Sequence, residues 1–213
     1  MLLSGGIDSA TALYLTKANN GVRAITFEYH GIARQELRAA REIASSAGVS
    51  EHRFVRLPDL KEAGDIVGAG FGRLPPTYIP LRNSIFYSFA ASYAEEVGAS
   101  SIVGGHNRDD EEIFEDVGSA FFRNLQGAYR AASPILRRNR ITIARPLRDR
   151  SKPEVIRMAT SLGVPLGLTW SCHRSGRRHC WHCDGCRARV KAFGAAGITD
   201  PLALKGGRKL LKQ

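Results

Sequence analysis

The order of strand and helix patterns limits the fold of this chain more than any other feature of its sequence. Segments typical of strands occur at 22–29 ("VRAITFEY"), 52–57, 100–105 and 140–147, and segments of helical period lie between them. A strand followed by a helix and another strand builds a parallel sheet with helices on both faces. We therefore predict an α/β fold with a doubly wound, mostly parallel sheet.

Several helical segments carry signals for a buried face or a helix end. The helix from residue 34 should close at Gly48, and Ser151 with Glu154 has the spacing of a capping box that starts another helix. A further helix is predicted over 112–131. For the helix from residue 82, the residues at core spacing are Ile85, Phe86, Phe89, Ala90 and Tyr93.

Residues 58–79 are rich in Gly and Pro and are predicted to form a long loop, which at this length is usually functional or mobile. The loop contains "GAGFGR". Because this stretch lacks the strand and helix that flank a dinucleotide-binding fingerprint, we interpret it as flexible loop sequence.

A glycine turn, Ser4-Gly5-Gly6, joins the apolar residues Leu2 and Leu3 to a helix expected from about Asp8. Such a turn leaves backbone N–H groups pointing one way at the positive end of a helix, which suits phosphate. The alternative is a plain corner with Asp8 as the N-cap. At about 3.3 Å per residue, residues 1–3 make only a stub of a central strand, so either this strand is short or it begins upstream.

Composition points to a globular protein of one main domain with an appendage. The chain has 213 residues, of which 43% are hydrophobic and 24% charged. No apolar run approaches the roughly 20 residues that span a membrane, and the first residues do not resemble a signal peptide. We therefore expect a cytoplasmic protein without membrane contact, in which four cysteines favour metal binding over disulfides.

Positive charge is concentrated near the C-terminal end. Of the net charge of +11, residues 170–213 contribute +8, from 10 Lys and Arg against Asp184 and Asp200. This favours an anionic partner such as a nucleotide, pyrophosphate or RNA, although a solvated surface explains it equally well. We place the domain boundary between residues 1–169 and 170–213.

All four cysteines lie in "SCHRSGRRHCWHCDGCRARV", at Cys172, Cys180, Cys183 and Cys186. Four thiolates can close a tetrahedron around Zn²⁺ and leave no open position for catalysis, so we predict a structural zinc site. An iron–sulfur cluster is the main alternative, and two disulfides are a weaker one. We interpret His173, His179 and His182 as bystanders.

An acidic run, "NRDDEEIFED", directly follows the predicted strand at 100–105. Ligands of parallel sheets bind at the carboxyl ends of strands, so these carboxylates could hold Mg²⁺ on nucleotide phosphates. They could equally form the acidic first turn of a helix.

Taken together, these residues resemble a known family. Ser4–Ser9 looks like the SGGxDS pyrophosphate loop of the adenylating ATP pyrophosphatases, and nearly the whole chain resembles the 7-cyano-7-deazaguanine synthase (QueC) family. The matching segments, in order, are "ITFEYHGIARQELRAAREIA", "YIPLRNSIFYSFAASYAEEVGASSIVGG", "RPLRDRSKPEVIRMATSLGVP" and "TWSCHRSGRRHCWHCDGCRARVKAFGAAGITDP". The cysteine segment is the most specific of these.

The resemblance implies a Rossmann-like PP-loop domain and an ATP-dependent carbon–nitrogen ligase. In this family, ATP adenylates 7-carboxy-7-deazaguanine, ammonia forms the amide, and a second activation removes the amide oxygen to leave a nitrile. The implied cofactors are ATP, Mg²⁺ and Zn²⁺. The implied partners are the deazapurine acid and ammonia, and we expect a homodimer.

Site residues follow from the same resemblance. Asp8, Ser9, Arg82, Asn83 and Lys152 are implied to serve catalysis, with Lys152 neutralising phosphate charge unless it is simply an exposed lysine. The residues implied to bind nucleotide or magnesium are Ser4, Gly5, Gly6, Asp8, Ser9, Phe27, Tyr29, Asn107, Asp110 and Asp116.

The chain departs from the family pattern at 29–33, at Leu81 and in the block 107–118, where the family's Pro, Cys and Arg are replaced. The block borders the deazapurine site of the family, so two alternatives stay open. One is a related ligase with another acceptor, either tRNA-borne deazaguanine or a protein amine. The other is a non-catalytic nucleotide- or RNA-binding module.

Overall fold

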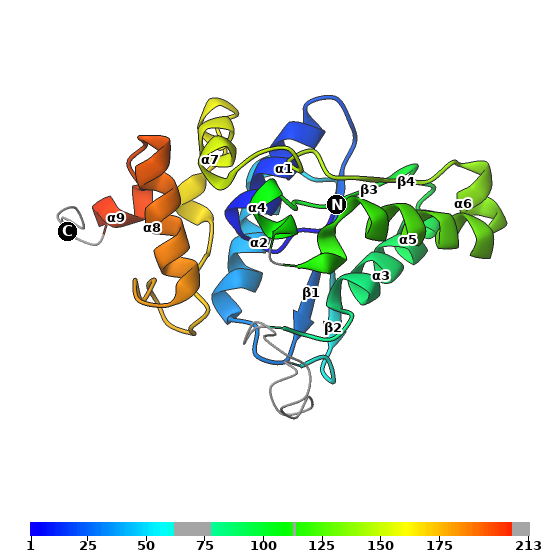
Figure 1. The fold of residues 1–213 in the computed structure, drawn as a ribbon, viewed down its shortest axis with the longest axis horizontal. Helices are drawn as coiled ribbons and strands as arrows, with labels where there is room; N and C mark the ends of the chain where they lie inside the picture. Colours follow the sequence, from blue (N-terminus) through cyan, green and yellow to red (C-terminus); the bar gives the residue numbers. More distant parts are fainter. Residues whose placement is uncertain (62–77, 113, 206–213) are drawn as a thin grey trace.

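A computed structural model of the protein describes residues 1–61, 78–112 and 114–205 (Figure 1). Most of the predicted loop at 58–79, including "GAGFGR", lies outside these residues. The elements are α1 Ile7–Lys17, β1 Arg23–Tyr29, α2 Arg34–Ala47, β2 Glu51–Leu57, α3 Arg82–Glu96, β3 Ser101–Val103, α4 Arg108–Glu111, the 3₁₀ turn η2 Glu115–Val117, α5 Ser119–Ala132, α6 Pro134–Arg138, β4 Thr142–Ala144, α7 Lys152–Ser161, η3 Leu166–Leu168, α8 Asp184–Ala196 and α9 Pro201–Lys205.

The strands form two parallel ladders joined through residues 1–3. β1 pairs with β2 from Arg23↔Glu51 onward, and β3 pairs with β4. The Leu2 N–H donates to the Val103 carbonyl of β3 at 2.9 Å, and the Leu3 N–H donates to the Ile25 carbonyl of β1 at 2.9 Å. The predicted parallel sheet is confirmed, and within the described residues the N-terminal segment is a stub that makes one isolated parallel bridge.

Helices cover both faces of this sheet, as predicted. Successive strand residues point to opposite faces, so Ala24 packs with α1, α2, α7 and α8, whereas Ile25 packs with α3, α5 and α6. Phe193 of α8 belongs to the first of these cores, so the C-terminal region packs directly against the domain. The boundary between 169 and 170 remains a prediction. No helix in the described part of the chain is long and apolar enough to cross a membrane.

The helix predicted over 112–131 is confirmed from Ser119 onward as α5, but its first part is wrong. The chain instead forms α4, leaves helical geometry, passes through η2 and starts α5 only at Ser119. The buried guanidinium of Arg145 donates to the Val117 carbonyl at 2.7 Å and pairs with Glu111. This distant side chain satisfies the backbone of the break, which local helical periodicity does not reveal.

The predicted buried face of α3 is wrong in part. Phe89 is 43% exposed, whereas Tyr87, outside the predicted set, is fully buried. The reason is Gly104, because a Cβ at this position would lie 1.8 Å from the Tyr87 hydroxyl oxygen. A glycine on the following strand end therefore makes room for a ring that would otherwise not fit.

A second glycine, Gly105, fixes how closely the end of β3 approaches α1. A Cβ there would lie 2.7 Å from the Ser9 backbone. We expect Gly105→Ala to lower the unfolding free energy by about 1–3 kcal/mol, because backbone atoms must move apart. Urea unfolding followed by circular dichroism measures this loss.

The matched control is Gly127→Ala in the middle of α5, where a Cβ would meet nothing within 4 Å. Alanine is the better helix former, so this variant should gain up to about 1 kcal/mol. Equal stability of Gly105→Ala and the unmodified protein would contradict the close approach.

Candidate functional site

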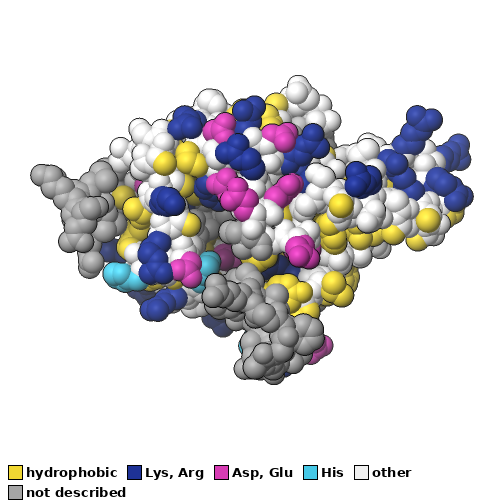
Figure 2. All heavy atoms as spheres, in the orientation of Figure 1, with side chains coloured by type: hydrophobic (Ala, Val, Ile, Leu, Met, Phe, Trp, Pro, Cys, Tyr) yellow, Lys and Arg dark blue, Asp and Glu magenta, His cyan; other side chains and the backbone are white. Residues whose placement is uncertain are grey.

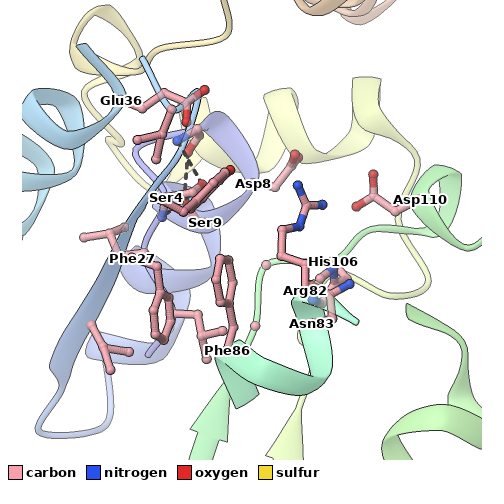
Figure 3. Close-up of a pocket in the computed structure, with 18 of the residues that line it drawn as sticks. Ser4, Asp8, Ser9, Phe27, Glu36, Arg82, Asn83, Phe86, His106 and Asp110 are labelled. Atoms are coloured by element: carbon pink, nitrogen blue, oxygen red, sulfur yellow. Dashed lines mark hydrogen bonds between the residues drawn. The ribbon is translucent and has the colours of Figure 1, made fainter. Parts of the chain in front are cut away.

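A cavity of about 330 Å³ opens at the carboxyl ends of β1 and β3, beside the start of α1 (Figure 3). It lies where parallel sheets usually bind ligands. The predicted residues that line it are Ser4, Gly6, Asp8, Ser9, Phe27, Tyr29, Arg82, Asn83 and Asp110.

The glycine turn is held by its own serines. The two hydroxyl oxygens of Ser4 and Ser9 lie 3.0 Å apart, and the Ser4 N–H donates to the Ser9 hydroxyl at 3.2 Å. Gly5 has a φ of +86°, and a Cβ on it would lie 2.5 Å from the Glu36 carbonyl oxygen. The N-cap of α1 is Gly6 rather than Asp8. The first-turn N–H groups have no acceptor inside a helix, and they belong to a stretch in which Gly6, Asp8 and Ser9 line the cavity.

Two carboxylates lie beside this turn. One oxygen of Asp8 accepts a hydrogen bond from the Lys152 ammonium, while the other, Oδ1, is buried without a hydrogen-bond partner among the described residues. Burial and the negative charge of Asp8 raise the pKa of Asp110 to about 6. Close carboxylate oxygens with one unsatisfied atom form a donor set that suits a hard divalent cation such as Mg²⁺.

Cationic and neutral groups from α3 and from the segment after β3 complete this side of the cavity. Figure 3 shows Asp8, Arg82 and Asp110 pointing toward one another. Asn83 is buried, and its amide donates to the Asp116 carbonyl at 3.3 Å. Burial, with the nearby guanidinium groups of Arg145 and Arg82, lowers the pKa of His106 to about 4, so this imidazole is neutral at pH 7.

The opposite wall is aromatic. Phe27 stacks on Phe86 with ring centroids 4.1 Å apart and planes 4° apart, and Tyr29 lies 5.7 Å from Phe86. An adenine bound here would lie against the stacked pair of Phe27 and Phe86 rather than against one isolated ring. Stacking of adenine here remains a prediction.

Four predicted residues lie outside the cavity wall. The Gly5 carbonyl accepts from the Trp170 N–H at 2.9 Å, behind the turn. The Asn107 side chain caps α4, accepting from the Asp109 N–H at 2.8 Å. Lys152 donates a hydrogen bond to Asp8, which does line the cavity, and Asp116 is not among the lining residues.

The sequence reasoning missed several lining residues, namely Glu36, Phe86, Gly104, Gly105, His106 and Trp170. The adjacent glycines after a strand were a usable signal for close backbone approach. Glu36 carried no signal, because one acid in the first turn of an amphipathic helix is ordinary.

Glu36 is the unusual group of the cavity. Its carboxyl is largely buried and makes no hydrogen bond among the described residues. Burial raises its pKa to about 7, although the Arg82 charge works in the opposite direction. Because the unfolded chain binds this proton only below about 4.5, the folded protein binds more protons between about pH 4.5 and 7, and it loses stability as the pH rises through that window.

We expect Glu36→Gln to abolish this loss. The difference in unfolding free energy between the variant and the unmodified protein should grow in favour of the variant by on the order of 2 kcal/mol from pH 5 to pH 8. Urea titrations across this range measure it, and the subtraction removes the contribution of Asp110. Parallel pH profiles would show that the carboxyl ionises normally.

The four cysteines form a second centre. Their sulfur atoms all lie within 4.8 Å of one another, with Cys180–Cys186 and Cys172–Cys183 each 3.9 Å apart. A tetrahedral ion with about 2.3 Å bonds to sulfur needs sulfurs about 3.8 Å apart, whereas a disulfide needs about 2.05 Å. The cluster therefore could hold one metal ion. No other such group occurs among the residues that the structure describes, and the knuckle histidines are outside this one.

We expect Cys183→Ser to lose the bound metal and to unfold partially, because metal binding of this kind is coupled to folding. Elemental analysis of the purified protein and a thermal melt measure the two effects. His182→Ala, an exposed neighbour outside the thiolate group, should keep both metal and melting temperature. A stable, metal-free Cys183→Ser protein would contradict a structural metal.

The chain is similar to known proteins over nearly its full length. A family model described as "Queuosine biosynthesis protein QueC" matches residues 1–197. The 7-cyano-7-deazaguanine synthase of Trichodesmium erythraeum is 38% identical over 218 residues, covering 95% of this chain and 98% of that protein. The enzyme of the same name from Thermoplasma acidophilum is 36% identical over 215 residues, covering 95% and 90%.

A solved structure supports the fold. The NMN synthetase from Francisella tularensis aligns with a TM-score of 0.54 and 18% identity, over 96% of this chain and 79% of that one. At this identity the likeness concerns the fold alone, and it agrees with the predicted Rossmann-like class.

Proposed function

The chain belongs to the queuosine biosynthesis protein QueC family, and from this premise we propose that it is an ATP-dependent 7-cyano-7-deazaguanine synthase. An oxygen of the 7-carboxylate attacks the α-phosphorus of ATP and releases pyrophosphate. Ammonia then displaces AMP and loses a proton, which gives the amide. The amide oxygen is adenylated by a second ATP, and loss of AMP with the remaining N–H protons leaves the nitrile.

The observation that carries this proposal is the rigid glycine turn beside the Lys152–Asp8 pair. Neither adenylation step needs a covalent side-chain nucleophile, so the chain contributes positioning and charge neutralisation. The N–H groups at the start of α1 would donate hydrogen bonds to pyrophosphate oxygens. Lys152 and Arg82 would offset the negative charge of the phosphates.

Two metal ions belong to the proposal. Asp8 and Asp110 would hold Mg²⁺, which when bound supplies positive charge to the ATP phosphates. Cys172, Cys180, Cys183 and Cys186 would hold Zn²⁺ as a structural ion, since four thiolates leave no open position. The spacing of the sulfurs suits one ion better than an iron–sulfur cluster, in which the cysteines bind different irons.

The deazapurine acid and ammonia are the proposed substrates, and a homodimer is the proposed assembly. No observation favours another acceptor or a purely non-catalytic nucleotide-binding role.

The direct test supplies purified protein with ATP, Mg²⁺, ammonium and 7-carboxy-7-deazaguanine and follows the products by mass spectrometry. We expect the nitrile, together with AMP and pyrophosphate. Asp8→Asn should lower the rate at least about 100-fold, because it removes a carboxylate that we propose to hold the Mg²⁺ on the ATP phosphates. Asp149→Asn, an exposed carboxylate 82% accessible at its side chain, is the matched control and should retain full activity.

The products that form show which step of the proposed reaction takes place. Amide without nitrile would mean that only the first activation operates. Unchanged ATP, with no exchange of pyrophosphate into it, would contradict the proposed reaction.

A further inference from the structure

A second hollow, separate from the cavity at the glycine turn, lies between α2 and the cysteine knuckle. This groove has a volume of about 440 Å³. Gln35 and Arg38 of α2 form one side, and Arg177, His179 and Trp181 of the knuckle form the other. Figure 2 shows histidine and basic side chains gathered below α8, in the region of the knuckle.

Aromatic rings form a continuous row in the groove. The Trp170 and His179 ring centroids are 4.2 Å apart, and those of His179 and Trp181 are 5.3 Å apart. Trp181 adopts a φ of +63°, which is costly for a residue with a side chain. The turn between Cys180 and Cys183 holds the ring in this position.

The groove also offers unpaired polar groups. Arg177 and Arg178 are exposed and make no ion pair within the described residues, whereas Arg38 is paired with Glu42 at 2.7 Å. The Gln35 side-chain oxygen is buried without a hydrogen-bond partner in the described part of the chain. The groove therefore combines a stacking surface, two free cations and one unsatisfied acceptor.

We propose that this groove binds a nucleotide, with its base against Trp181, a base N–H donated to Gln35 and its phosphate at Arg177 and Arg178. Aromatic rings with nearby arginines are the usual means of holding an unpaired base and its phosphate. The nucleotide can come from two sources, a free mononucleotide or an unpaired stretch of RNA. The proposal is independent of the synthase reaction, because the nitrile assay with small substrates does not involve the groove.

Tryptophan fluorescence can report on binding in this groove. Trp170 and Trp181 are the two tryptophans of the protein, and both line the groove. Trp170 also lines the cavity at the glycine turn. We would therefore saturate that cavity with a non-hydrolysable ATP analogue and Mg²⁺, and then titrate the zinc-loaded protein with GMP or with a single-stranded RNA hexamer of alternating G and U.

Tryptophan fluorescence should be quenched in a saturable way. Trp181→Ala should weaken binding about tenfold or more, and Trp181→Phe, which keeps an aromatic ring, should restore most of it. Arg177→Glu with Arg178→Glu should weaken binding at least about tenfold and reduce its salt dependence. Arg174→Glu, an exposed arginine of the same knuckle outside the groove, is the control and should bind normally.

The metal content of each variant is measured, so that loss of the knuckle is not mistaken for loss of the site. Equal affinity for GMP and the hexamer would assign the groove to a free nucleotide. A hexamer that binds at least about tenfold tighter, with a steeper salt dependence, would assign it to RNA. No quenching by either probe, or unchanged affinity in the zinc-loaded arginine variant, would overturn the proposal.

Discussion

The arrangement of the site depends on the hydrogen bonds that residues 1–3 make to the strands on both sides. The Leu2 N–H donates to Val103 of β3, and the Leu3 N–H donates to Ile25 of β1, so this short segment joins two ladders that share no strand among the described residues. The Leu3 carbonyl also accepts from the buried Thr26 hydroxyl at 2.5 Å. The next residue is Ser4, and the glycine turn therefore leaves the sheet from a fixed point between β1 and β3.

Close backbone approach then gives the cavity its shape. Gly5 lies against α2, and Gly105 lies against the first turn of α1, at distances that a Cβ would make impossible. Side chains from separate elements meet in the space that remains. Lys152 of α7 reaches Asp8 of α1, and their pairing places a cation beside the turn that we propose for pyrophosphate.

Side chains next to the cysteine knuckle link it to the rest of the domain. The buried Arg189 of α8 pairs with Asp200 at 2.6 Å and donates to Thr169 at 2.8 Å, which ties the helix after the knuckle to the segment before it. The adjacent Trp170 donates from its backbone N–H to Gly5 and from its ring to the Cys172 carbonyl. One residue therefore connects the cysteine cluster to the glycine turn and lies in the walls of both hollows.

The parallel α/β class, most helices, the cysteine cluster and the family could all be predicted from the sequence, because they depend on local periodicity, turn chemistry and short spacing. The capping box at Ser151 and the left-handed end at Gly48 are local in this sense, and both are present. Four features could be seen only in the folded protein, namely the break before α5, the burial of Tyr87, the burial of the Glu36 carboxyl and the row of rings beside the knuckle. Each of these depends on a group distant in the sequence, such as Arg145 for the break or Gly104 for Tyr87. The contacts that stabilise these features exist only after the chain has folded, so no local sequence pattern predicts them.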